Sequence, residues 1–353
     1  MTGTVVTPEG SDFTVREVPF DRPDPYANAR LAEIGQEIAL LEATAAQFYG
    51  TDAGHGRTRR SRIDHTNPAT RAILDRLPAS AAWLATVPTA AALHPLYHPE
   101  DPALPSGTPI DAETRDWFRN IADARGIRSR AAVMQDVLTR EATGAAPGRW
   151  LSLACGAAQP VFHTLESLAA AGGPVPHVTL ADLDQNALRL ATTYAAAHGL
   201  TEHTHPVRTN VLTRDGFARL PRPVPGLTRP SGWLETFDAV DAVGILEYLK
   251  PEDWTYTYRG ILTTRRVLAG AVTFLRNAFA CVKPGGLLLV GNMLTSHPQL
   301  GFTLNVIQWP HIQPRSSDDM LALFAAAGLR GHLDIHRPDD GVYAVYVIRK
   351  PLS

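Results

Sequence analysis

Residues 150–182 combine residue types that suit nucleoside binding. An apolar stretch at 150–153 leads into a turn of small residues at 154–158, and a second apolar stretch at 178–181 ends at Asp182. Small residues let a ligand approach the backbone, and a helix that follows offers free N–H groups. An acidic side chain at the end of the next strand can hydrogen-bond ribose hydroxyls. The segment is typical of one nucleoside-binding half of a doubly wound sheet.

The 154–158 turn alone does not identify the ligand. A dinucleotide-binding turn carries three glycines spaced G-x-G-x-x-G. This turn has only Gly156, with alanine at positions 154 and 158, which disfavours a nicotinamide dehydrogenase. An ordinary strand-to-helix turn of small residues remains open at this point.

From residue 149 onward, strand patterns alternate with helical patterns. This alternation predicts an α/β fold built on a doubly wound, mainly parallel sheet of seven strands. The strands are expected at 150–154, 178–182, 204–210, 237–243, 287–290, 331–336 and 342–349, the last two as an antiparallel edge pair. The helices are expected at 160–171, 186–197, 260–281 and 318–326.

The N-terminal part shows helical periodicity and no strand alternation, and its first twenty residues are expected to be loosely ordered. Helices are expected at 31–49, at 68–77, from 111 through Ile121 and at 129–141, with an irregular, proline-rich connection at 94–110. We therefore expect two domains. Residues 1–145 would form a helical substrate or lid domain, and residues 146–353 a cofactor-binding α/β domain.

Five chemical features occur in a fixed order at the carboxyl ends of the predicted strands, where open α/β sheets bind ligands. They are the 154–158 turn, Asp182 with Asp184, Asn210 with Val211, the segment 244–248 and the turn 283–286. This order resembles the class I S-adenosylmethionine-dependent methyltransferase family over about residues 148–350. The resemblance implies a Rossmann-like methyltransferase fold and S-adenosylmethionine as cofactor.

The resemblance also implies which residues contact the cofactor: Leu153, Ala154, Cys155, Gly156, Asp182, Leu183, Asn210, Val211, Gly244 and Ile245. Asp182 would hold the ribose hydroxyls, Leu183 would pack against adenine, and Asn210 would accept from the adenine amino group. Each also has a structural alternative. Asp182 could cap the following helix, although Asp184 is better spaced for that, and Asn210 could be a plain turn residue.

The chain departs from the family pattern at three places. Ser152 stands where these enzymes often have an acidic residue, and Ala154 and Ala158 replace glycines. Asn210 replaces the usual aspartate and can still hydrogen-bond adenine, but without charge. These departures bear on the affinity for the cofactor more than on its identity.

A sulfonium methyl group is already activated, so alignment of the reactants contributes more than a base does. Positioning can supply about 7–11 kcal/mol, whereas a general base adds roughly 10²–10⁴-fold. The catalytic candidates are His297, Glu247 and Tyr248, with Tyr256, Tyr258 and His311 as further candidate bases. Each of them could instead be structural.

Two segments are expected to form the acceptor pocket, because both mix apolar and polar side chains. They contribute Trp117, Phe118, Arg125, Arg128, Arg130 and Met134 from 111–134, and Asn292, Met293, His297, Phe302, Asn305, Trp309 and His311 from 292–313. Core packing is the alternative for Trp117 and Phe118. An apolar lid suits an aromatic or secondary-metabolite acceptor.

Composition excludes several classes of partner. The net charge of −2 provides no basic field for nucleic acid, and the basic run at 57–62 is expected to be a solvated loop. Two cysteines provide neither a disulfide framework nor a cysteine zinc site, and no metal spacing occurs among the histidines. The sequence has neither a signal peptide nor a membrane-spanning stretch, so we expect a cytoplasmic protein with a small-molecule acceptor. The oligomeric state stays open, a homodimer included.

Three functions remain open from the sequence. The first is methyl transfer to oxygen, nitrogen or carbon of a small molecule. The second uses the same pocket for another sulfonium displacement, such as cyclopropane ring closure. The third is a non-catalytic nucleoside-binding regulatory protein, since fold alone does not settle function.

Overall fold

The computed structural model describes residues 13–50, 63–142, 148–213, 233–259 and 263–352, without the side chains of 256–259 and 263–266. At its centre is an eight-stranded sheet. The strands run in the order β4 (Thr204–Arg208), β3 (His177–Asp182), β2 (Arg149–Leu153), β5 (Phe237–Ala242), β8 (Val282–Met293), β10 (Tyr343–Arg349), β9 (Gly331–Pro338) and β1 (Phe13–Phe20). Only β10 runs antiparallel to its neighbours. The predicted Rossmann-like, mainly parallel sheet is confirmed, with eight strands where seven were expected.

The additional strand, β1, comes from the N-terminal part, where no strand was expected. Phe13 and Val15 are buried while Thr14 and Arg16 are exposed, so the segment alternates as a half-buried strand does. It pairs in parallel with β9 and therefore lies outside the antiparallel pair β9–β10 at the sheet edge. The expectation of a loosely ordered start is wrong for residues 13–20. The alternation of buried and exposed residues is short and is interrupted by charged residues, so the sequence pattern did not predict this strand.

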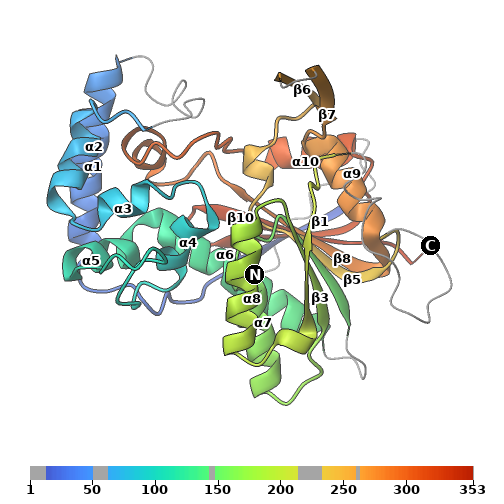
Figure 1. Ribbon diagram of the computed structural model, residues 1–353. Helices are drawn as coiled ribbons and strands as arrows, with labels where there is room; N and C mark the ends of the chain where they lie inside the picture. The colour runs from blue at the N-terminus through green and yellow to red at the C-terminus, as the bar shows by residue number, and fades with distance from the viewer. Residues whose placement is uncertain (1–12, 51–62, 143–147, 214–232, 260–262, 353) are drawn as a thin grey trace.

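Helices cover both faces of the sheet (Figure 1). Three helices cover one face: α6 (Ala122–Glu141), α7 (Gln159–Ala170) and α8 (Gln185–Ala197). They pack on strand side chains that include Trp150, Val178 and Ala239. On the other face, α9 (Ala271–Cys281) and α10 (Ser317–Ala326) pack on strand side chains that include Leu151, Val240 and Leu288. Because successive strand residues point to opposite faces, this arrangement explains why the central strands are apolar throughout.

The remaining helices gather beside the sheet (Figure 1). They are α1 (Leu31–Tyr49), α2 (Pro68–Arg76), α3 (Ser80–Leu84), α4 (Ala90–Tyr97) and α5 (Ala112–Asn120). Their core also contains Phe302, Trp309 and other side chains from the segment after β8, so both parts of the chain contribute to it. Helix α4 overlaps the connection that was expected to be irregular. It is short and contains Pro95, which argued against a helix.

A second correction concerns the long helix expected at 260–281. Two strands, β6 (Trp254–Arg259) and β7 (Thr263–Leu268), instead pair antiparallel, and the helix is limited to α9. The threonine- and tyrosine-rich composition of β6 favours a strand over a helix. Gly270 fits closely against the backbone of Glu252, which separates the strand pair from the helix.

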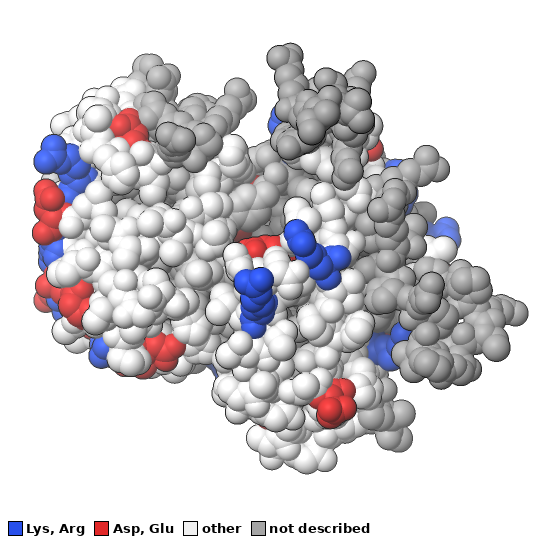
Figure 2. Space-filling view, viewed as in Figure 1, with Lys and Arg blue, Asp and Glu red and all other residues white. Residues whose placement is uncertain are grey.

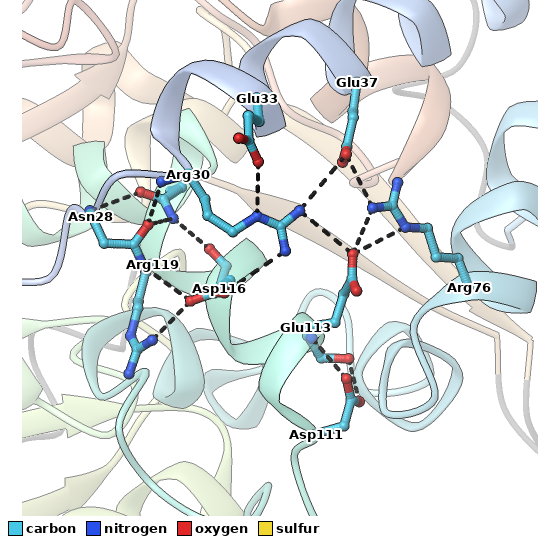
Figure 3. Close-up of polar contacts among 11 residues, drawn as sticks. Asn28, Arg30, Glu33, Glu37, Arg76, Asp111, Glu113, Asp116 and Arg119 are labelled. Carbon is cyan, nitrogen blue, oxygen red and sulfur yellow. Dashed lines mark hydrogen bonds and ion pairs between the residues drawn. The ribbon is translucent and has the colours of Figure 1, made fainter.

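A network of exposed ion pairs joins α1, α2 and α5 (Figure 3). Arg76 reaches Glu37 of α1 at 3.0 Å and Glu113 of α5, and Arg30 lies within 4.0 Å of the same two carboxylates. Arg30 also contacts Glu33 and Asp116, so Arg76 pairs with two acids and Arg30 with four, and the network links the three helices. Individual exposed pairs contribute about 0–1 kcal/mol.

Candidate functional site

The 154–158 turn joins the end of β2 to the start of α7. Ala154, Gly156 and Ala158 have φ values of 50°, 56° and 55°, all in the left-handed region. A left-handed conformation costs a non-glycine residue about 1–2 kcal/mol. Hydrogen bonds hold the turn in place, from Cys155 N–H to Ala181 O at 3.3 Å and from Ala158 N–H to Cys155 O at 2.8 Å. Such retained strain is typical of functional turns.

Asp182 at the end of β3 points back to this turn. Its Oδ2 accepts from Gly156 N–H at 2.8 Å and its Oδ1 from Asp184 N–H at 2.8 Å. A carboxylate has about four acceptor positions, so two remain for ligand hydroxyls. Burial raises the pKa of Asp182, although backbone N–H donors, chiefly those of Asp184 and Gly156, oppose that rise. Asp184 is the N-cap of α8, as expected, and accepts from Asn186 N–H at 2.8 Å.

The next two cofactor candidates lie in different environments. Leu183 is 55% exposed and leaves an apolar surface beside Asp182. Val211 is buried in the core under the sheet. Asn210 Oδ1 accepts from Leu212 N–H at 3.0 Å, so its side chain stabilises a turn, which is the structural alternative for this residue.

The turn forms one wall of a cavity of about 80 Å³. Its walls are residues 152–161 from β2 to α7, Ala90, Leu93 and Tyr97 of α4, Arg130 of α6, and Asp241, Val243 and Gly244 at the end of β5. Complete small-molecule pockets measure about 300–1,000 Å³. The cavity is therefore large enough for one end of a nucleoside-sized ligand, and the rest must extend beyond it.

Helix α4 forms one wall of this cavity, which the sequence patterns did not predict. A Cβ added to Gly156 would meet Ala90 at 3.5 Å. His94 Nδ1 lies 2.7 Å from Gln159 Nε2 at the start of α7, and His94 Nε2 lies 2.7 Å from Asp101 Oδ2. The His94–Gln159 contact therefore ties α4 to the start of α7, beside the turn.

Asp241 is a second residue that the sequence did not single out. It faces Ser152 across the β2–β5 register, and Ser152 Oγ donates to its Oδ1 at 2.9 Å. Asp241 is 7% exposed, and burial raises its pKa to about 7. The neighbouring strand thus places a carboxyl beside Ser152, where the family pattern led us to expect an acid. Only the strand register brings the two residues together.

The thiol of Cys155 also lines the cavity. Burial, followed by the nearby Asp182 and Asp241 carboxylates, raises the pKa of this thiol well above its ordinary value. A protonated thiol is a poor nucleophile. Its contribution is a small apolar wall.

Gly244 lines the cavity, and Ile245 is buried immediately after it. The three catalytic candidates lie farther on, outside the lining of the cavity. Glu247 is 4% exposed, its Oε2 has no hydrogen-bond partner, and burial raises its pKa. Tyr248 OH accepts from Trp309 Nε1 at 2.7 Å, which holds this phenol in the wall of the helical core.

His297 is fixed by contacts on both ring nitrogens. Its Nδ1 accepts from Gln299 N–H at 2.9 Å, which places the proton of the neutral ring on Nε2. That Nε2 lies 3.5 Å from Asp123 Oδ1, and the His297 side chain is completely buried. The ring therefore points at a buried acid and not at the cavity.

Of the residues expected to form the acceptor pocket, only Arg130 lines the cavity. Arg128 donates to Asp24 and to the carbonyls of Leu96, Phe118 and Arg119, which ties α4 and α5 together. Several others are buried in the cores, namely Trp117, Phe118, Met134, Met293, Phe302 and Trp309. Three others have partners elsewhere in the structure. The Asn292 side chain accepts a hydrogen bond from Arg315, Arg125 lies 3.8 Å from Asp24, and the backbone carbonyl of Asn305 accepts from Asn67. His311 is exposed. The side chains of Tyr256 and Tyr258 lie outside the described part.

A larger cavity, of about 180 Å³, lies between α6 and the outer strands β9 and β10. Its cationic side chains are matched by carboxylates: Arg16 binds Asp334, and Arg349 binds Glu141. It is far from the strand ends that carry the 154–158 turn. The smaller cavity is therefore the candidate ligand site, on its chemistry and not on its size.

Figure 2 shows one face of the molecule with a recess near its middle. Acidic side chains lie in this recess, and Lys or Arg side chains lie directly beside it. The basic run at 57–62 lies outside the described residues. None of the described helices is long and apolar enough to span a membrane. In the described part of the chain, no group of three or more His, Cys, Asp or Glu side chains is arranged to hold a metal ion.

Comparison with known proteins establishes the fold. No family model and no curated protein matches the sequence. The chain is similar to a possible exported protein from Bordetella parapertussis. The match covers 90% of this chain and 96% of that protein, with 17% identity and a TM-score of 0.56. The similarity to the CMeT domain of the citrinin polyketide synthase covers 93% of this chain and 92% of that domain, with 13% identity and a TM-score of 0.49. The similarity to an O-methyltransferase family protein from Burkholderia thailandensis covers 93% of this chain and 90% of that protein, with 17% identity and a TM-score of 0.45. The chain shares its overall fold with the Bordetella protein, and its own eight-stranded, mainly parallel sheet is Rossmann-like, as expected apart from the eighth strand.

Proposed function

We propose that the protein is an S-adenosylmethionine-dependent methyltransferase that acts on a small-molecule acceptor. The observation that carries this proposal is the contact between Gly156 N–H and Asp182 Oδ2, which holds an acid against a strained turn at the carboxyl ends of two neighbouring strands. This geometry suits a ribose whose hydroxyls reach Asp182. The exposed Leu183 beside it then offers an apolar surface to adenine.

The proposed cofactor would lie across the strand ends. Its adenosine would rest on Asp182 and Leu183, and its amino-acid end would enter the cavity beside Gly156. The sulfonium would pass close to Gly244, where β5 ends. A small-molecule acceptor is favoured by the net charge of −2, which provides no basic field for nucleic acid.

In this proposal the chain contributes chiefly alignment. The sulfonium supplies the activated methyl group, and the protein holds nucleophile, carbon and sulfur in line. Glu247 is the strongest candidate base among the three proposed, because its carboxyl is buried and one oxygen is unpartnered. A raised pKa makes such a carboxylate a better proton acceptor near neutral pH.

Calorimetric titration with S-adenosylmethionine, S-adenosylhomocysteine and NAD tests the cofactor. We expect binding of both sulfur compounds and none of NAD. Incubation with pooled aromatic and secondary-metabolite acceptors then tests the reaction, with S-adenosylhomocysteine and a product heavier by one methylene unit as readout. Tight cofactor binding without turnover would support the regulatory alternative, and binding of NAD alone would refute the proposal.

A further inference from the structure

Four histidines lie together where the C-terminal end of α4 meets α7 and α8. They are His94 and the C-cap His98 of α4, His163 of α7 and the C-cap His198 of α8. The ring centre of His98 lies 5.0 Å from that of His94 and 5.3 Å from that of His163. His98 and His198 also stack on the ring of Tyr194, at 6.3 Å and 4.1 Å. Imidazole rings therefore take part in the contact of α4 with these two helices.

The outer two histidines have acid partners, and the inner two do not. His94 Nε2 lies 2.7 Å from Asp101 Oδ2, and His198 Nδ1 lies 2.6 Å from Glu166 Oε1. Within the described part of the chain, neither inner ring forms an ion pair, and the buried Nε2 of His98 has no hydrogen-bond partner. A proton on an outer ring is therefore offset by a carboxylate. A proton on an inner ring adds a charge without a partner, which is unfavourable.

The packing of α4 disfavours protonation of the inner pair. Burial, followed by the charges of His163 and His94, lowers the pKa of His98 to about 4. Burial also lowers the pKa of His163, although the Glu166 carboxylate opposes that change. A ring that is released into water regains an ordinary pKa near 6.5. Below that pH the released state of α4 therefore binds more protons than the packed state, so acid favours release.

The other ionisable groups around α4 come from every element packed against it. They are Tyr97 of α4, Glu100 and Asp101 after it, Arg119 of α5, Arg128 and Arg130 of α6, Glu166 of α7 and Tyr194 of α8. Histidine is the side chain whose ordinary pKa lies between pH 5 and 8. The histidine cluster is therefore the part of this contact that is suited to respond in that range.

Helix α4 is suited to such a release. It is eight residues long, has no side-chain cap at its N-terminus and contains Pro95, which cannot donate a helical hydrogen bond. The same helix contributes Ala90, Leu93 and Tyr97 to the lining of the cavity beside the 154–158 turn. A change in the packing of α4 therefore reaches this cavity.

We propose that the histidine cluster is an acid-sensitive latch for α4. While the inner rings are neutral, α4 packs on α7 and α8. When these rings take up protons, their like charges separate α4 from the two helices and loosen one wall of the cavity. The latch itself is independent of the ligand, whereas its effect on binding rests on the proposed function.

Hydrogen exchange of the α4 amides at pH 7.5 and pH 5 tests the latch, with rates corrected for the intrinsic pH dependence of exchange. We expect protection to fall about tenfold or more in the unaltered protein, because the pKa of His98 differs between about 4 when packed and about 6.5 when released. In H98Q/H163Q the fall should be less than about threefold. The matched control is H203Q, because His203 stacks on His177 at 5.4 Å, where β3 begins; it should behave like the unaltered protein.

A titration of the histidine ring protons by NMR serves if the double variant does not fold. In the unaltered protein we expect at least one ring to titrate well below pH 6, over the range in which α4 loses protection. Protection of α4 that is equal at pH 7.5 and pH 5 would overturn the latch. So would a loss that is equally large in H98Q/H163Q.

The effect on the cavity is measured as the affinity for S-adenosylhomocysteine at the same two pH values. Asp241 titrates in the unaltered protein and in H98Q/H163Q alike, so its contribution cancels in the comparison. We expect the affinity of the unaltered protein to fall at least about threefold further than that of the variant, since a ligand that contacts α4 favours its packed state. Equal losses would overturn the link between latch and cavity. If the unaltered protein did not bind at pH 7.5, the proposed function would fail, whereas hydrogen exchange would still decide the latch.

Discussion

The ion-pair network of the helical part and the lining of the cavity differ in whether their charged side chains form ion pairs. In Figure 3, Arg30 and Arg76 are partly exposed, and each contacts at least two carboxylates. In the lining of the cavity, Arg130 and Asp241 are buried, and they form no ion pair with each other. Exposed charges that are fully paired indicate a structural role. Buried charges that lack a charged partner indicate a ligand.

The largest expected effect comes from Asp241. Its pKa is raised from an ordinary 3.8 to about 7, so the folded state binds more protons than the unfolded state between these values. Stability therefore falls as pH rises from 4 to 7, by about 4 kcal/mol in total. We expect D241N to be more stable than the unaltered protein by about that amount at pH 8, and by almost nothing at pH 4.

Urea unfolding of both proteins at pH 4, 6 and 8 measures this difference. Other acids with raised pKa values, such as Asp182, affect both proteins alike and cancel. A pH-independent difference in unfolding free energy would show that Asp241 is not a buried, destabilising carboxylate in the free protein.

The strained turn should give a smaller effect. Ala154 has a φ of 50°, which glycine adopts without the steric cost of about 1–2 kcal/mol. Glycine also loses more entropy on folding, by roughly 0.5–1 kcal/mol. We expect A154G to raise the unfolding free energy by about 0.5–1 kcal/mol in thermal or urea unfolding. The control A157G, at a position without a left-handed backbone, should not stabilise; equal effects at both positions would argue against strain at Ala154.

The smallest effect is expected in the network of Figure 3. Arg76 is 44% exposed, so R76M should lower the unfolding free energy by less than about 1 kcal/mol. The loss should shrink further in 1 M salt, since exposed pairs are screened. A salt-independent loss of several kcal/mol would mean that this network behaves like a buried one, and would remove the contrast with the cavity.

The sequence predicts the part of the site that depends on local order. Strand ends of a parallel sheet meet at one edge, so the turn with Gly156 and the acid Asp182 could be placed together from their order alone. The same rule predicts most of the sheet. Asp184 as helix cap follows from spacing alone and is confirmed.

The missing parts depend on contacts between distant segments. Asp241 meets Ser152 only through the register of two strands separated by a long connection. Helix α4 covers the turn through tertiary packing, and its sequence with Pro95 argued for a loop. The edge strand β1 required a partner, β9, that lies more than 300 residues away along the chain. No periodicity contains such information.

The most direct test of the central claim is the affinity of D182A for S-adenosylhomocysteine, measured by calorimetry beside the unaltered protein. Two hydrogen bonds from ribose hydroxyls to a charged acceptor contribute about 3 kcal/mol or more together. The account predicts that D182A weakens binding about hundredfold or more, while the matched variant D184N binds normally. Unchanged affinity in a folded D182A protein would contradict the account.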